Sequence, residues 1–264
     1  MLQTIGKRTL GAFGATVGVL VLCGLILGFV EGKSTTYLYG LFGWGGIVVT
    51  GLVGTPIHEL GHFLMCKLFG FHVSEVALFR PIAGRTDGVL GFVRYSYDKG
   101  SLWQRLGCFF VGIAPMVLGV AAILLILRFL TPEIFHSTRD RLAQAVRRGG
   151  GPLALVGAAF SGFFGGLVRL RGAGIARGLV CLYLLFSIST HMTLSPADLS
   201  GAAVGLIVVA ALCLIFGVVT TLLKVEVVPA LKKTAVTLFA FLSVGTVFAL
   251  LALLLFGGLF LLIK

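Results

Sequence analysis

The stretch "GTPIHELGHFLMCKLFG", residues 54–70, places two histidines and a glutamate inside a run that is otherwise apolar enough to cross a membrane. The whole chain has a similar composition: 58% of its 264 residues are hydrophobic and only 11% are charged. Soluble proteins have about a quarter charged residues, so we interpret this chain as an integral membrane protein. In such a protein, ionisable groups at membrane depth are costly and commonly functional.

Long uncharged runs recur along the chain, and about 20 predominantly apolar residues are enough for a helix to cross a bilayer. The runs predict an all-α polytopic membrane protein that forms a single integral membrane domain. We expect about six transmembrane helices, at approximately residues 9–30, 41–67, 103–130, 177–194, 197–223 and 234–263. Lys7 and Arg8 precede the first run, which predicts an uncleaved signal anchor with its N-terminus in the cytoplasm.

Two connecting segments differ from these runs. Residues 71–101 combine charges with β-branched and aromatic residues around a turn-rich centre, which predicts a cytoplasmic β-hairpin with strands near 72–80 and 89–97. Residues 131–176 are basic, and we expect them to be partly interfacial or re-entrant. Within them, 149–168 is uncharged but contains seven glycines, so it can cross the membrane, re-enter it or lie on its surface.

The net charge of +12 does not indicate a nucleic-acid-binding protein. The basic residues flank the apolar runs, where they meet anionic lipid headgroups and help to set orientation. No stretch interleaves basic and aromatic residues over a length that would form a nucleic-acid-binding face. The five cysteines lie in apolar runs without a CxxC pair, which predicts buried thiols and neither a disulfide nor a sulfur-ligated metal: Cys23, Cys66, Cys108, Cys181 and Cys213.

The segment from His58 to His62 matches the pattern HExxH. Residues four apart lie on one face of a helix, so both imidazoles can reach one metal ion. Glu59 follows the first histidine and is placed to take a proton from a water that the ion activates. The alternative is a pair of structural histidines bonded to neighbouring helices, but the cost of ionisable groups inside a span favours the metal site.

A catalytic zinc ion takes three protein ligands, so a third must come from elsewhere in the chain. Asp198 has apolar surroundings and follows Ser195-Pro196, which predicts the first turn of a helix. A carboxylate there also suits the helix dipole without any metal, but the need for an oxygen ligand favours coordination. Apart from Glu59, the remaining acidic residues are predicted in loops: Glu31, Glu75, Asp87, Asp98, Glu133, Asp140 and Glu226.

Four features together resemble the site-2 protease family of intramembrane zinc metalloproteases: the HExxH within a span, the following hairpin, Pro115 in "GIAPMVLG" and a late Pro-and-Asp motif. The resemblance covers about residues 41–223. The family's second motif has an Asn and Leu-Asp-Gly, whereas this chain has "SPADLSG" at 195–201. The substrate-holding or oxyanion role of that Asn is therefore unfilled. His191 or Thr193 can substitute, although an interhelical hydrogen bond is the other interpretation of His191.

The resemblance implies a hydrolase, specifically a zinc metalloendopeptidase that cuts transmembrane substrates. It implies that one Zn²⁺ is held by His58, His62 and Asp198 and that Glu59 is the catalytic general base. The implied partners are a membrane-embedded protein substrate and the lipid bilayer. The charge pattern further predicts a multi-pass protein of the plasma (inner) membrane, with the active site near the cytoplasmic side.

Other classes of function compete with this prediction. A metal-ion transporter can use the same His and Asp cluster, but Glu59 would then be superfluous and no inverted repeat is visible in the sequence. A catalytically silent membrane scaffold is a further alternative. A Ste24-like prenyl-protein protease would need a glutamate as its third ligand, for which only Glu226 in "KVEVVPA" is available. The hairpin is either a connector or an edge strand that pairs with an unwound substrate segment.

Overall fold

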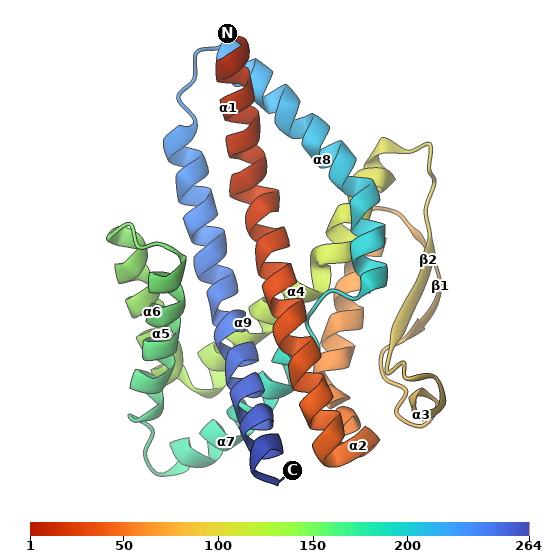
Figure 1. The fold of residues 1–264 in the computed structure, drawn as a ribbon, viewed down its shortest axis with the longest axis vertical. Helices are drawn as coiled ribbons and strands as arrows, with labels where there is room; N and C mark the ends of the chain where they lie inside the picture. Colours follow the sequence, from red (N-terminus) through yellow and green to blue (C-terminus); the bar gives the residue numbers. More distant parts are fainter. Residues whose placement is uncertain (264) are drawn as a thin grey trace.

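The computed structural model describes residues 1–263 and is largely helical (Figure 1). The helices are α1 (Leu2–Phe13), the π-helical segment η1 (Gly14–Gly18), α2 (Val19–Leu68), α3 (Gly84–Asp87), α4 (Leu102–Leu130), α5 (Pro132–Arg147), α6 (Pro152–Leu167), α7 (Ala173–Ser189), α8 (Pro196–Leu222) and α9 (Val228–Ile263). One antiparallel sheet joins β1 (His72–Ala77) to β2 (Phe92–Ser96). The predicted all-α class, with a small hairpin after the HExxH helix, is therefore confirmed.

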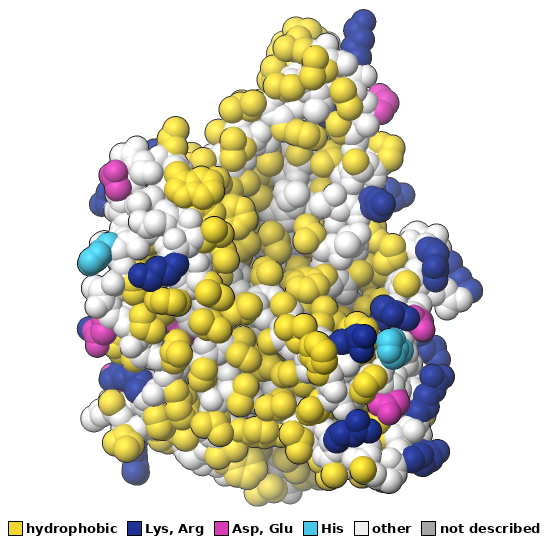
Figure 2. All heavy atoms as spheres, turned by 180° about the vertical axis from the view of Figure 1, so that it is seen from behind, with side chains coloured by type: hydrophobic (Ala, Val, Ile, Leu, Met, Phe, Trp, Pro, Cys, Tyr) yellow, Lys and Arg dark blue, Asp and Glu magenta, His cyan; other side chains and the backbone are white. Residues whose placement is uncertain are grey.

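Four helical stretches of the described chain are long and apolar enough to cross a membrane: Leu2–Leu68, Leu102–Leu130, Ala197–Leu222 and Val228–Ile263. Large apolar side chains such as Leu25 and Phe29 point outward from the first of these. Figure 2 shows hydrophobic side chains over the centre of one face, with Lys and Arg gathered towards its margins. A surface of this kind suits lipid better than water, and we describe the chain as a membrane protein. The expected total of six spans stays a prediction.

The first helical stretch continues well beyond the predicted end of the first span at residue 30. It bends at Gly43, where φ is +58° and ψ is −152°, a conformation that glycine adopts readily. The chain doubles back there, so that the two halves of α2 run antiparallel (Figure 1). The prediction that Glu31 lies in a loop is therefore wrong. Charged residues alone do not end a helix, and no proline interrupts residues 31–42.

The β-hairpin folds back along the second half of α2. Its strands pair from His72 opposite Ser96 to Ala77 opposite Phe92, within the predicted strand ranges. The single turn α3 connects them, and beside it the indole Nε1 of Trp44 donates to the carbonyl of Pro81 at 2.9 Å. Because Trp44 directly follows the bend in α2, the hairpin's tip lies at the opposite end of this half-helix from Leu68.

Helices α5 and α6 form an antiparallel pair from the basic segment. Each has 16 residues, which gives about 24 Å of helix and is shorter than the hydrocarbon thickness of a bilayer. The glycines of α6 allow close packing: a Cβ on Gly162 would lie 2.5 Å from the Cα of Thr138, and one on Gly166 would lie 2.4 Å from the Cα of Ile134. The pair starts at α4 and returns to α7 on the same side of the molecule (Figure 1), so the two helices add no net crossing to the path.

The cysteines lie in the apolar packing and are all free. Four are buried and Cys213 is half-buried, as the prediction of unpaired apolar thiols requires. The main core lies between α2, α4, α7 and α9 and includes Met116, Leu185, Leu242 and Phe248. This core fixes α4 and α7 against α2, and both helices contribute to the site described next.

Candidate metal centre

The structure brings His58, His62 and Asp198 together, although α4 to α7 separate the aspartate from the histidines in the sequence. One ligand atom from each residue can be chosen so that all lie within 4.8 Å of one another. The Nε2 atoms of the two histidines are 3.1 Å apart. Asp198 Oδ1 lies 3.1 Å from His62 Nε2, and Asp198 Oδ2 lies 3.8 Å from His58 Nε2. These three residues could therefore hold a metal ion.

A backbone carbonyl on α4 orients His62. Its Nδ1 lies 2.9 Å from the carbonyl oxygen of Val111, which can only accept, so Nδ1 carries the proton and Nε2 has a free lone pair. Val111 is four residues before Pro115, and proline has no N–H to complete that helical bond. Pro115 thus leaves this carbonyl available to the histidine. Gly61 permits the approach, since a Cβ there would lie 3.1 Å from backbone atoms of Ala114 and Pro115.

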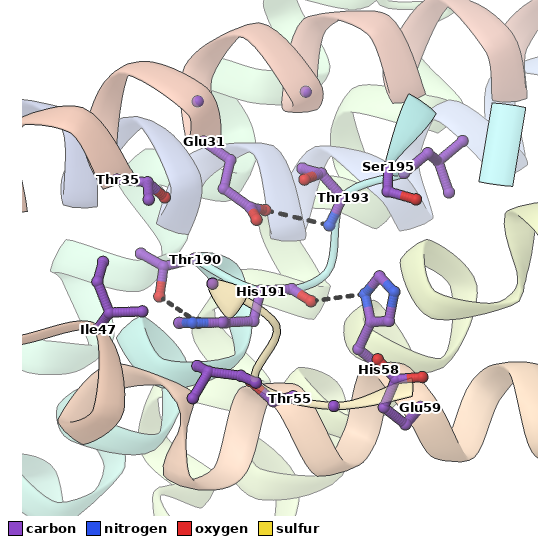
Figure 3. Close-up of a pocket in the computed structure, with 16 residues that line it drawn as sticks. Glu31, Thr35, Ile47, Thr55, His58, Glu59, Thr190, His191, Thr193 and Ser195 are labelled. Atoms are coloured by element: carbon purple, nitrogen blue, oxygen red, sulfur yellow. Dashed lines mark hydrogen bonds between the residues drawn. The ribbon is translucent and has the colours of Figure 1, made fainter. Parts of the chain in front are cut away.

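A second carbonyl, just beyond the end of α7, orients His58. Its Nδ1 donates to the carbonyl of His191 at 2.8 Å (Figure 3). The His191 ring turns away and its Nδ1 contacts Thr190 Oγ1 and the carbonyl of Ser187, both at the C-terminal end of α7. The prediction of an interhelical bond from the His191 side chain is therefore wrong. Its backbone makes that contact, because carbonyls at a helix C-terminus lack intrahelical partners.

Asp198 combines the two roles that the sequence left open. It is the third residue of α8 and forms a capping box with Ser195: Asp198 Oδ2 accepts from the Ser195 N–H at 2.8 Å, and Ser195 Oγ accepts from the Asp198 N–H at 3.2 Å. The other carboxylate oxygen, Oδ1, faces His62. The cap fixes the carboxylate at the helix start, and the same carboxylate reaches the histidines.

The donor set fits a divalent metal. With Nδ1 of each histidine occupied by a carbonyl, the two facing Nε2 atoms are both lone-pair donors and cannot hydrogen-bond to each other without an extra proton. Zinc–nitrogen bonds of about 2.0–2.1 Å at a tetrahedral angle put the nitrogens roughly 3.3 Å apart, close to the 3.1 Å observed. Two histidines and one carboxylate form a common ligand set of catalytic zinc sites.

Glu59 lies beside this cluster and is 7% exposed. The segment that leads into β2 covers it: a Cβ on Gly91 would lie 2.8 Å from Glu59 Cγ and 2.8 Å from Thr55 Cγ2. The absence of a side chain at Gly91 therefore allows the hairpin to pack directly on the HExxH helix. Glu59 still borders open space, since it lines a pocket together with His58.

That pocket has a volume of about 450 Å³ and is formed by four segments: both halves of α2, the turn before β2, and the connection between α7 and α8. Figure 3 shows Glu31 and Thr193 on one side of it and Thr55 and Glu59 on the other. Sequence reasoning missed Glu31 and Thr55. Thr55 is one helical turn before Glu59, and this spacing could have identified it; Glu31 was misplaced in a loop.

Comparisons of this chain with protein-family models, with curated proteins and with solved structures find no match.

Proposed function

We propose that this protein is an intramembrane zinc metalloprotease that hydrolyses peptide bonds of transmembrane substrates. The convergence of His58, His62 and Asp198 carries the proposal. Each histidine Nδ1 contacts a carbonyl, and each Nε2 faces the same point. The resemblance to the site-2 protease family adds support from the sequence.

In the proposed chemistry the metal ion and residues of the chain have separate roles. A zinc ion supplies Lewis acidity, which acidifies a water and polarises the scissile carbonyl. Glu59 accepts the proton of the attacking water and returns it to the leaving amide nitrogen. Gly91 covers one side of Glu59, so this side chain is accessible mainly from the pocket that it lines with His58. The carbonyls of Val111 and His191 hold the imidazoles in the tautomer that binds metal.

The substrate class follows from the surroundings of the site. A helical peptide bond is shielded, so a membrane-embedded substrate must unwind before its carbonyl can be attacked. The hairpin lies along the HExxH helix, and its sheet has only two strands, so each strand has an unpaired edge that can accept an extended segment. We place the protein in the plasma membrane. Lys7 and Arg8 favour a cytoplasmic N-terminus, and the second half of α2 runs antiparallel to the first, so it returns towards the cytoplasm and carries the site near that side.

Metal content and cleavage test the proposal together. Purified wild-type protein should contain one zinc per chain and cut a reporter transmembrane segment, and Asp198→Ala should lose the zinc. Retention of zinc in Asp198→Ala would remove this residue from the centre. Zinc binding without cleavage of any reporter would favour the scaffold, and zinc flux into vesicles without cleavage would favour the transporter.

A further inference from the structure

Beyond the metal centre, the pocket extends to a carboxylate on the first half of α2. Glu31 lines it together with Gly28, Gly32 and Thr35, residues that share one helical face. Lys33, two residues further on, is exposed and belongs to the opposite face, because successive helical residues are about 100° apart. The helix therefore directs its acidic side chain into the pocket and its basic side chain away from it.

Among residues 1–263, no lysine or arginine neutralises this carboxylate. The hydrogen-bond donor to Glu31 is a neutral group: the Thr193 N–H lies 3.1 Å from Oε2. Within residues 1–263, no Lys or Arg forms an ion pair with Glu31. The other titratable residues that line the pocket are His58, Glu59 and His191. The pocket thus presents two carboxylates and no lysine or arginine.

The pocket also has room and an unused polar group. A Cβ on Gly28 or on Gly32 would meet no atom within 4 Å, so the wall beside Glu31 is open. Thr55, on the facing half of α2, is 5% exposed, and its Oγ1 has no hydrogen-bond partner among the residues that the structure describes. Buried hydroxyls are normally paired, and an unpaired one that lines a pocket indicates a ligand with a polar group.

We infer that this pocket binds the side chain of a lysine or arginine that lies near the scissile bond of the substrate. The inference rests on the proposed proteolytic function and names its specificity. An ammonium or guanidinium complements Glu31 in charge and can donate to Thr55 Oγ1. The aliphatic stem of such a side chain suits Ile47, Leu90 and Leu194, which supply apolar lining.

Binding to a non-cutting enzyme tests the inference separately from catalysis. Zinc-loaded Glu59→Gln protein in lipid nanodiscs is titrated with a fluorescent apolar peptide carrying one lysine, moved through each position in turn. The matched probe has acetyl-lysine at the same position, which keeps the stem and removes the charge. At one position the lysine peptide should bind about tenfold more tightly than the acetyl-lysine peptide, as expected for a hydrogen-bonded charged group.

Adding Glu31→Gln should abolish that preference, because glutamine keeps an acceptor for Thr193 N–H and removes the charge. Glu226→Gln is the matched control: it removes a carboxylate that is 81% exposed and pairs with Arg8, and the preference should persist.

Equal binding of both probes at every position, no binding of either, or a preference that survives Glu31→Gln would overturn the inference. If Glu31→Gln fails to fold, Gly32→Leu, which fills the pocket without changing charge, should lose the preference, and its retention would overturn the inference equally. Absence of cleavage by wild-type protein, with the lysine preference intact, would reject the proposed protease and not the pocket.

Discussion

The two histidines of the centre have equivalent supports that are built in different ways. His62 donates to a carbonyl inside α4, which Pro115 leaves without its helical partner. His58 donates to a carbonyl in the connection after α7. We call these the helix-borne and the loop-borne halves of the centre.

The loop-borne half also delivers the third ligand. The connection runs from the His191 carbonyl to Ser195, which caps α8 and positions Asp198. One hydrogen bond, from the Thr193 N–H to Glu31, holds the middle of this connection to the first half of α2. A helix interior holds its groups through many packed neighbours, whereas a connection depends on a few bonds. The comparison predicts that the two halves respond differently to mutation.

The largest effect should come from Glu59, which takes part in the chemistry of the whole centre but orients neither histidine. Glu59→Gln should lower proteolysis by on the order of 10²–10⁴, because it removes the general base. Zinc content should stay at the wild-type value, since the carbonyl bonds of both histidines are untouched. Cleavage of a reporter span and metal analysis of the same preparation measure the two quantities. Full activity in this variant would reject the mechanism.

Pro115→Ala should weaken the helix-borne half. Alanine supplies the N–H that proline lacks. This N–H then competes with His62 Nδ1 as a donor to the Val111 carbonyl. Loss of such an outer-shell bond typically costs 10- to 100-fold in metal affinity. The free energy of unfolding should not fall, because alanine is the better helix former. Zinc affinity against a competing chelator and thermal unfolding check the two directions.

Pro56→Ala is the matched control for that variant, since Pro56 also lies inside a helix. It restores an N–H towards Leu52, whose carbonyl orients neither histidine. Its zinc affinity should stay near that of the wild type. Equal losses in both proline variants would show that a general change in helix shape, and not the Val111 carbonyl, is responsible.

The sequence predicted the ligands more completely than their supports. HExxH spacing and the Ser-Pro-x-Asp helix start are local patterns, and the structure brings His58, His62 and Asp198 together. Pro115 was noted as one feature of the family resemblance, and its effect on Val111 depends on how α2 packs against α4. No local pattern determines that packing. Glu31 was misplaced because charges were taken as the end of a span, whereas the backbone bends at Gly43.

Glu31→Ala should loosen the loop-borne half by a smaller amount. It removes the acceptor for Thr193 N–H and leaves all three ligands in place. A single hydrogen bond to a charged group contributes about 1.5–3 kcal/mol at most, and part of it is recovered as the connection relaxes, so zinc affinity should fall about tenfold or less. Glu31→Gln, which keeps an acceptor, should bind zinc like the wild type. Equal zinc affinity in the two variants would show that this bond does not hold the connection.

The smallest effect concerns the hairpin, which supplies no ligand to either half. If β1 or β2 accepts an unwound substrate as an added strand, proline at an outward-facing position removes one donor from the new ladder. Cleavage should then fall roughly two- to tenfold, the value of one backbone hydrogen bond. Zinc content should not change, because the carbonyls and carboxylates around the metal belong to other segments.

Alanine at the same position is the control for each proline, because alanine shortens the side chain but keeps the N–H. A scan of β1 and β2 with both residues therefore separates backbone pairing from side-chain contact. A fall with proline alone, at alternate positions of one strand, would identify the edge that binds the substrate, since successive N–H groups point to opposite sides of a strand. If proline and alanine lower cleavage equally at a position, side-chain contact with the substrate is responsible there; if neither lowers cleavage anywhere in both strands, the hairpin only connects α2 to α4. Glu59 would then have to meet a substrate that is held by the transmembrane helices alone.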